Sequence, residues 1–170
     1  MKFPTLLVIL ALVAAPALAD QRDVDSDPST DFSAYHTFLI RPGQINARAP
    51  ELNSAITRKR IEEGLRAQLS ARQLREVSSQ PDLVVTWHFG SVPKKEVQTW
   101  VTGRWGRGRA YSTYRFTEGT LVVDLYERGD RNLVWRGIYR DDESNPSRIS
   151  SRLDDDIKKL FKDFPPKRKK

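Results

Sequence analysis

The stretch from residue 117 to residue 139 constrains the fold most, because it predicts two strands joined by a short polar turn. In the first strand, aliphatic residues recur at every second position, which is the period of a strand with one buried face. That face would hold Leu121, Val123 and Leu125, and the opposite face would hold Thr120, Val122, Asp124 and Tyr126. A hairpin of this kind belongs near the middle of a sheet that needs cover on one face.

The turn and the second strand complete this hairpin. Residues 127–132 include Gly129, Asp130 and Asn132, which are residue types that tolerate left-handed backbone angles. The second strand would place Leu133, Trp135 and Tyr139 on one side and Val134 and Ile138 on the other. We expect Arg136 to pair with Asp124 across the two strands.

Two amphipathic helices can cover the sheet. The first is predicted over residues 53–72, with Asn53 or Ser54 as its cap and Gly64 marking a close approach to the sheet. Its apolar stripe is Ile56, Ile61, Leu65 and Leu69. The second is predicted over residues 147–164, because Asn145-Pro146 is a favourable start for a helix. Its apolar stripe is Ile149, Leu153, Ile157, Leu160, Phe161 and Phe164.

Shorter apolar runs predict the remaining strands. A turn over residues 31–35 would bury Phe32 and Tyr35, and a short edge strand is expected near Val24. Arg41-Pro42-Gly43 is expected to end the strand over residues 36–40, and a linker is expected to follow over residues 44–50. Residues 74–77 fit either a short strand or an extended link. We expect further strands over residues 36–40, 83–89, 97–102 and 111–116, with an interruption at 90–93 and a loop over 103–110.

This order of elements predicts an α+β fold, an antiparallel-rich sheet with two amphipathic helices packed on one face. The 170 residues fit a single domain, which we expect over residues 20–164, followed by a basic C-terminal tail over residues 165–170.

The N-terminus predicts a signal peptide over residues 1–19. Lys2 precedes an apolar run, and Ala17-Leu18-Ala19 has the small residues at a cleavage site before Asp20. The run is shorter than the about 20 residues that span a bilayer, so no transmembrane helix is expected in the mature chain. A retained N-terminal anchor is the alternative.

The chain contains no cysteine, which excludes disulfides, thiolate catalysis, cysteine-ligated zinc and lipid attachment at cysteine. We therefore expect an exported, periplasmic protein that is not lipidated and is at most peripheral to the membrane.

Four segments together resemble a known family. They are residues 31–38 (DFSAYHTF), 81–85 (PDLVV), 117–125 (TEGTLVVDL) and 133–137 (LVWRG). In this order they resemble the bacterial envelope family catalogued as domain of unknown function 4136. The resemblance implies a secreted, often lipid-anchored envelope protein with no established activity, and it implies no catalytic residues. This chain departs from the family in having no cysteine for a lipid and in having arginines in the loop before residue 117.

Catalytic and metal-binding patterns are weak. His36 and His88 are the only histidines, and no closely spaced cluster of His, Asp and Glu accompanies them. Glu118 and Asp124 would lie roughly 20 Å apart along one strand, whereas the carboxylates of glycosidases lie within about 10 Å. We expect no catalytic residue, no metal and no cofactor.

One segment favours a function. Residues 94–115 contain six cations and one acid, a net charge of +5, interleaved with aromatic residues. The candidate residues for binding an anion or lipid are Trp100, Arg104, Trp105, Arg107, Arg109 and Arg115. In an exported protein the available polyanions are anionic envelope lipid and lipopolysaccharide, and nucleic acid is not expected. A solvated loop that protects a sheet edge is an equal alternative.

The sequence thus favours an exported, non-enzymatic binding or structural module of the envelope, which contacts anionic lipid, lipopolysaccharide or another envelope protein. The alternative is a periplasmic hydrolase whose site is assembled across strands. A pocket with converging polar groups of shifted pKa would favour the hydrolase.

Overall fold

The computed structural model describes residues 22–102, 108–128, 132–141, 143 and 145–166, and for residues 91–102 and 108–118 it describes the backbone alone. The elements in chain order are β1 (Arg22–Ser26), the 3-10 turn η1 (Phe32–Ala34), β2 (Thr37–Ile40), β3 (Gln44–Ala47), α1 (Ala55–Ser70), β4 (Arg75–Glu76), β5 (Leu83–Thr102), β6 (Gly108–Glu127), β7 (Leu133–Asp141) and α2 (Pro146–Leu160).

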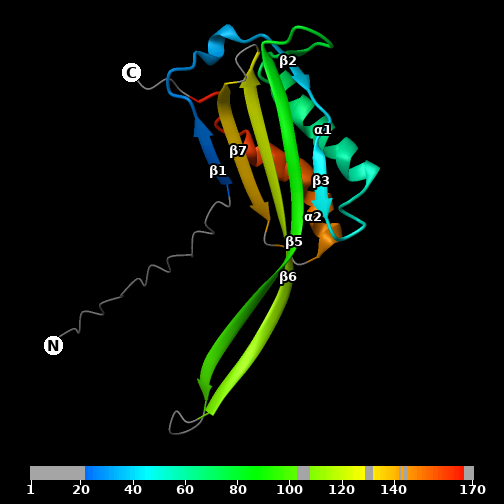
Figure 1. Cartoon of the computed structure of the whole chain (residues 1–170), viewed down its shortest axis with the longest axis vertical. Helices are drawn as coiled ribbons and strands as arrows, with labels where there is room; N and C mark the ends of the chain where they lie inside the picture. Colours follow the sequence, from blue (N-terminus) through cyan, green and yellow to red (C-terminus); the bar gives the residue numbers. More distant parts are fainter. Residues whose placement is uncertain (1–21, 103–107, 129–131, 142, 144, 167–170) are drawn as a thin grey trace, which may run out of the picture.

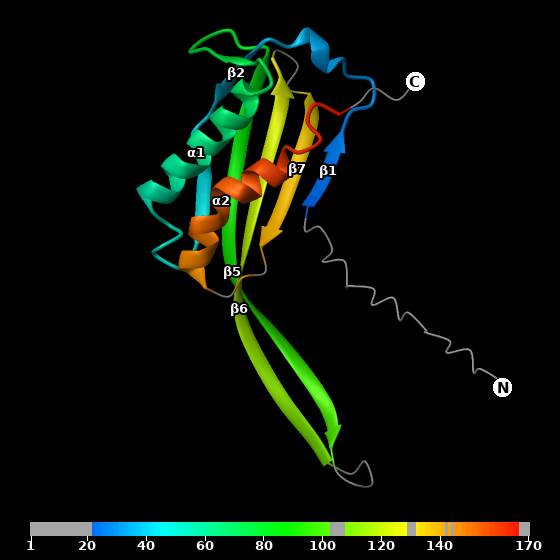
Figure 2. The same cartoon turned by 180° about the vertical axis from the view of Figure 1, so that it is seen from behind.

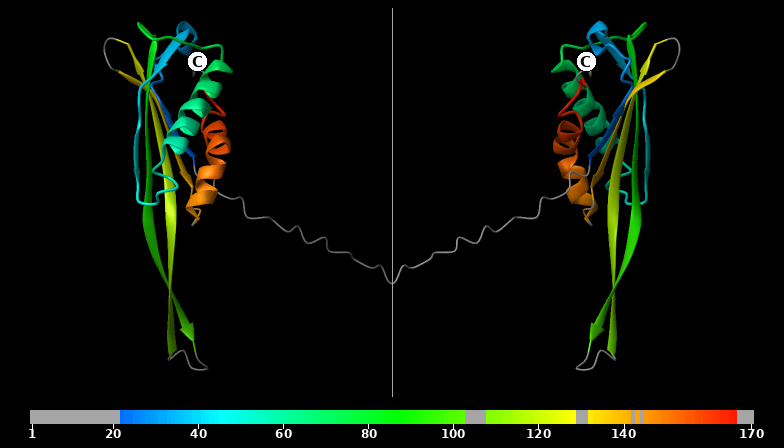
Figure 3. Two further views of the ribbon diagram at one scale, coloured as in Figure 1. Left: turned by 90° about the vertical axis from the view of Figure 1, so that its right-hand side faces the viewer. Right: turned by 90° about the vertical axis from the view of Figure 1, so that its left-hand side faces the viewer.

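The strands form one mixed sheet in the order β1-β7-β6-β5-β2-β4, with β3 also pairing to β5. In this sheet β1, β7, β6 and β5 are each antiparallel to the next. By contrast, β2 and β3 run parallel to β5, and β4 runs parallel to β2. Both helices lie on one face of this sheet (Figures 1 and 2), and the edge-on views show the other face without a helix (Figure 3). The predicted α+β fold is confirmed.

The core lies between the sheet and the two helices. The predicted alternation in β6 is confirmed, because Leu121, Val123 and Leu125 are buried there. They meet the alternate residues of β5, which are equally buried: Leu83, Val85, Trp87 and Phe89. Phe32 and Tyr35, predicted to be buried, are half-buried against the margin of this core.

Helix α1 begins at the predicted cap Ser54, whose hydroxyl accepts a hydrogen bond from the Thr57 amide (3.1 Å). The predicted stripe is wrong at its first residue, because Ile56 is 71% exposed and Thr57 is buried in its place. Thr57, Ile61, Leu65 and Leu69 recur every four residues and share one face, whereas a spacing of five turns Ile56 away from it.

Gly64 does mark a close approach, but the approach is to α2 and not to the sheet. A Cβ atom at Gly64 would lie 2.7 Å from the Cδ1 atom of Ile157. The helices therefore pack against each other as well as against the sheet. This contact explains why a residue of low helix propensity occupies the middle of α1.

Helix α2 confirms its predicted start and its predicted stripe. The Asn145 side chain accepts hydrogen bonds from the amides of Ser147 and Arg148, and Pro146 occupies the first turn. The helix ends at Leu160, earlier than predicted, and a short turn carries the chain on to Phe164. The whole stripe is buried: Ile149, Leu153, Ile157, Leu160, Phe161 and Phe164.

Strand β7 departs from the predicted alternation. Leu125 pairs with Trp135 while Tyr126 pairs with Leu133, so a bulge at Val134 interrupts the register. As a result Leu133 is 38% exposed and Val134 is buried, the reverse of the predicted faces. The remainder of the strand follows the prediction, with Trp135 and Tyr139 facing the helices.

The linker predicted over residues 44–50 contains a strand, β3, which pairs with β5. The edge strand predicted near Val24 is confirmed as β1, and the strand alternative for residues 74–77 is confirmed as β4. No helix formed by the described residues is long and apolar enough to cross a membrane.

Strands β5 and β6 extend well beyond the rest of the sheet. Their pairing is continuous from Leu83 with Glu127 to Thr102 with Gly108, so neither the interruption predicted at residues 90–93 nor the full loop predicted at 103–110 is correct. The last pair of β6 with β7 is at Gly119. Beyond it the two strands form a ribbon that projects from the body (Figures 1 and 3), and we call residues 92–118 the arm.

Candidate functional site

The arm carries the sequence-predicted binding segment away from the body. Trp100 lies on β5, and Arg109 and Arg115 lie on β6. The remaining candidates, Arg104, Trp105 and Arg107, fall outside the described residues. The structure thus places three of the six candidates on the backbone of one ribbon.

The register of the arm brings cationic positions together. Trp100 pairs with Ala110 and Val101 pairs with Arg109, so these four positions are neighbours at the far part of the ribbon. Lys95 pairs with Arg115, which sets two cations at directly opposite positions. Like charges at opposite positions destabilise a strand pair unless an anion offsets them.

A second candidate site is an open groove of about 810 Å³ on the sheet face that has no helix. The floor of the groove contains residues that alternate with the buried residues of β5 and β6, which places the groove on the face opposite to the helices. These floor residues are Val84, Thr86, His88 and Tyr126. Its margins are two loops, one over residues 41–43 and one over residues 79–81.

The groove lies beside a break in the edge of the sheet. β2 pairs with β5 up to Ile40 with Val85, and β3 resumes at Gln44 with His88. Residues 41–43 therefore lie opposite only residues 86–87 of β5 and interrupt the pairing. The loop is fixed because the Arg41 amide donates to Val85 O (2.9 Å) and the Arg58 guanidinium donates to Gly43 O. Only glycine fits at position 43, since a Cβ atom there would come within 2.1 Å of the Trp87 ring.

The opposite margin is fixed by Asp82. Its Oδ2 atom accepts hydrogen bonds from the amides of His36 and Thr37 (both 2.9 Å) and from the Thr37 hydroxyl (2.8 Å). These bonds hold the pKa of Asp82 below its usual value, the His36 amide being the largest cause. Gln80, next to this anchor, has a φ of 52°, a left-handed conformation that is uncommon for a residue other than glycine.

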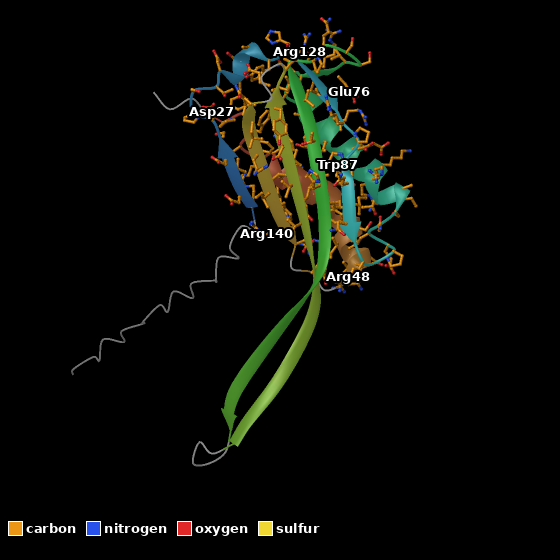
Figure 4. All side chains as sticks on the ribbon, in the orientation of Figure 1. Asp27, Arg48, Glu76, Trp87, Arg128 and Arg140 are labelled. Atoms are coloured by element: carbon orange, nitrogen blue, oxygen red, sulfur yellow. The ribbon has the colours of Figure 1, made fainter. Side chains whose placement is uncertain are left out.

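The groove carries two cations that no described side chain compensates. Neither the Arg41 nor the Arg128 side chain forms an ion pair or a hydrogen bond with another described residue. The nearby carboxylate of Glu127 accepts a hydrogen bond from the Tyr35 hydroxyl (3.1 Å). Burial, followed by this contact with Glu127, raises the pKa of Tyr35 to about 12. Figure 4 shows Arg128 at the end of the body away from the arm.

The predicted pair of Asp124 and Arg136 is confirmed. The Arg136 guanidinium donates to both carboxylate oxygens of Asp124, at 2.7 and 2.8 Å, and the Tyr126 hydroxyl donates to the same carboxylate at 3.4 Å. Asp124 is therefore buried although it lies on the outer face. The pair joins β6 to β7 on the outer face of the sheet.

A buried polar cluster lies beneath α2. Asp156 is 2% exposed, and burial raises the pKa of its carboxyl group. The Lys159 ammonium is 3.6 Å from Asp156 Oδ1 and donates to the Tyr139 hydroxyl at 3.3 Å. Asp141, also buried, has Arg152 at 3.7 Å. This cluster does not line the groove and joins α2 to β7.

The two histidines are exposed and lie apart, His36 before β2 and His88 on β5. Among the described residues, no three His, Asp or Glu side chains lie together in a way that could hold a metal ion.

Comparison with known proteins agrees with this architecture. The profile of the family described as a domain of unknown function, DUF4136, matches residues 22–166. The chain belongs to the DUF4136 family. Comparison with curated proteins gives no significant match.

Solved structures share the fold of this DUF4136 chain at low identity. A DUF4136 family protein from Bacteroides thetaiotaomicron is 12% identical, with a TM-score of 0.58 over 85% of this chain and 95% of that one. PelC from Paraburkholderia phytofirmans, solved as a dodecamer, is 14% identical, with a TM-score of 0.50 over 82% and 95%. A PDZ domain protein from Parabacteroides distasonis is 11% identical, with a TM-score of 0.60 over 86% of this chain and only 36% of that longer protein.

Sequence reasoning about this DUF4136 chain missed the groove. Its cations, Arg41 and Arg128, are far apart in the sequence, and they lie in segments predicted to be the end of a strand and a turn. Arg41 and Arg128 border a common surface because β2 and β3 both pair with β5 and because the Arg128 amide donates to Asp82 O. One local signal is present, Arg41-Pro42-Gly43, but it predicts only the end of a strand.

Proposed function

We propose that this DUF4136 protein is an exported, non-enzymatic binding or structural module of the bacterial envelope, and that its arm contacts anionic lipid or lipopolysaccharide. The observation that carries the proposal is the continuation of β5 and β6 beyond the body. Eleven consecutive pairs, from Val92 with Glu118 to Thr102 with Gly108, extend the ribbon by roughly 35 Å at about 3.3 Å per residue.

Charge supports a polyanionic surface as the target of the arm. Residues 94–115 carry a net charge of +5, and each cation near an anionic lipid surface contributes about 1 kcal/mol to binding. The tryptophans of this segment suit the polar interface of a membrane. A ribbon that extends from the body can present these residues to a surface without requiring a pocket.

Export is the second part of the proposal. The apolar run and the Ala17-Leu18-Ala19 sequence support removal of residues 1–19, and the absence of cysteine supports a periplasmic protein without a cysteine-linked lipid. The intact mass of the protein isolated from cells tests this part. A dominant species that retains residues 1–19 would overturn it.

The arm is tested by co-sedimentation of the processed protein with vesicles containing phosphatidylglycerol, with neutral vesicles as the reference. Replacement of Arg104, Arg107 and Arg109 by serine is expected to weaken binding on the order of 100-fold, from about 1 kcal/mol per cation. Binding is expected to fall at 1 M salt, where the Debye length is about 3 Å.

A charge-matched control separates the arm from general electrostatics. Arg75, Lys158 and Lys162 are exposed cations on the body, and their triple replacement by serine removes the same charge. The control is expected to bind nearly as well as the wild type. Equal loss in the two triple variants would assign binding to net charge alone and reject the arm as the site.

A further inference from the structure

We propose that the groove on the helix-free face of the sheet is a binding site for a short anionic saccharide, a chain of sugar rings that carries carboxylate or phosphate groups. This site is separate from the arm and does not depend on the function proposed for it. Three features of the groove support the proposal: its fixed shape, its uncompensated cations, and the combination of an aromatic ring with amide side chains.

The shape of the groove is set before a ligand arrives. One margin is fixed to β5 by the bond from the Arg41 amide and to α1 by the bond from Arg58 to Gly43. The other margin is anchored by Asp82, whose own carbonyl accepts a hydrogen bond from the Arg128 amide (3.0 Å). Left-handed backbone at a non-glycine residue, as at Gln80, is found disproportionately at ligand-binding sites. A preorganised site loses little conformational entropy on binding.

The charge of the groove selects an anion. Arg41 and Arg128 border it without a carboxylate partner among the described residues. Glu127, the one acid among the described residues that line the groove, interacts with Tyr35. The guanidinium group binds carboxylate and phosphate in bidentate geometry. Two such groups on one open surface suit a ligand with more than one negative charge.

The floor of the groove suits sugar rings. The Tyr126 hydroxyl is bonded to Asp124 on the same face of β6, so the ring lies along the strand and lines the groove. Gln44, Thr86 and His88 also line it, and their amide, hydroxyl and imidazole groups exchange hydrogen bonds with sugar hydroxyls. A groove of about 810 Å³ that is open along the sheet accommodates a chain of a few rings.

The test is calorimetric titration of the processed full chain with trigalacturonate, a trisaccharide with three carboxylates. Maltotriose is the neutral saccharide of matched length, and triglutamate is the anionic ligand without sugar rings. We expect trigalacturonate to bind at least about tenfold more tightly than either of the other two, because both the charge and the rings contribute. Binding is expected to weaken in 0.5 M salt.

Variants assign the binding to the groove. Arg41→Gln with Arg128→Gln is expected to lower the affinity for trigalacturonate about tenfold or more, while the melting temperature stays unchanged. The matched control is Arg140→Gln, an exposed arginine on the same sheet that does not line the groove and lies near the base of the arm (Figure 4). It is expected to change the affinity less than about twofold.

Several outcomes would reject the site. Absence of trigalacturonate binding, or equal binding by the double variant, means that the groove is not the site. Equal binding of maltotriose rejects the role of charge, and equal binding of triglutamate assigns the surface to acidic peptides instead. The arm variants with serine at positions 104, 107 and 109 are expected to bind trigalacturonate normally, which separates this test from the vesicle assay.

Discussion

Asp156 and Asp82 show how the surroundings of a carboxyl group decide the direction in which its pKa shifts. Asp156 is a buried residue of α2, and burial raises the pKa of its carboxyl group, with the hydrogen bond from Tyr139 opposing this effect. Hydrogen bonds from His36 and Thr37 lower the pKa of Asp82, with burial opposing. The two groups therefore make contributions to stability that depend on pH in opposite directions.

We predict that Asp156→Asn gains stability relative to the wild type as the pH rises. Because the folded pKa is raised above the unfolded value of 3.8, the unfolded state loses its proton first, and the contribution of Asp156 to stability falls as the pH rises through that interval. The side-chain amide of asparagine does not titrate in this range, so the variant lacks this loss of stability. Urea midpoints of both proteins between pH 3.5 and pH 7, with Asp154→Asn as an exposed control on the same helix, would measure the effect. A constant difference across this range would contradict the prediction.

The opposite trend is predicted for Asp82→Asn. The loss of well-placed acceptors should cost about 1–3 kcal/mol near pH 7. Since the folded pKa is lowered, the contribution of Asp82 is present above the unfolded value of 3.8 and is lost as the pH falls through the folded one. The gap between the variant and the wild type should thus shrink in acid. A gap that widens in acid would assign the stabilisation to another group.

At the scale of elements, α2 holds the two layers together through its apolar stripe. Leu160 is 1% exposed, and we predict that Leu160→Ala lowers the free energy of unfolding by about 2–4 kcal/mol through lost burial and a cavity. Lys158→Ala, an exposed change, should cost less than about 0.5 kcal/mol. Lys159 is not a suitable control, because its ammonium contacts Tyr139 and Asp156. Similar urea midpoints for the two variants would show that α2 does not dock through this stripe.

The elements that sequence predicts well are those with a strong local period. The hairpin of β6 and β7 and the stripe of α2 have repeats long enough to identify their buried faces. The structure corrects the prediction where an element forms because of residues that are distant in the sequence. Strand β3 has only four residues and exists because it pairs with residues 88–91 of β5, and the bulge at Val134 depends on the opposite strand. The groove could not be predicted for the same reason, since its margins meet only through pairing.

At the scale of the whole molecule, the body and the arm are expected to be separable. Among the side chains that the structure describes, the buried core residues fall within residues 38–89 and 121–164. We predict that replacing residues 92–118 with Asn-Gly, which favours a tight hairpin turn, leaves the melting temperature within a few degrees of the wild type and abolishes binding to anionic vesicles. Thermal unfolding followed by circular dichroism, with the vesicle assay, would measure both. A large fall in melting temperature would show that the arm supports the body.

The pairing of β1 with β7 has a consequence for the order of folding. Arg22 pairs with Tyr139 and Ser26 with Trp135, so the first strand of the body finds its partner near the end of the chain. A chain emerging from its N-terminus cannot complete this edge until residue 139 is available. Contacts so distant in sequence slow folding. If the chain is exported as proposed, this delay would keep the sheet open until nearly all of the chain has crossed the membrane.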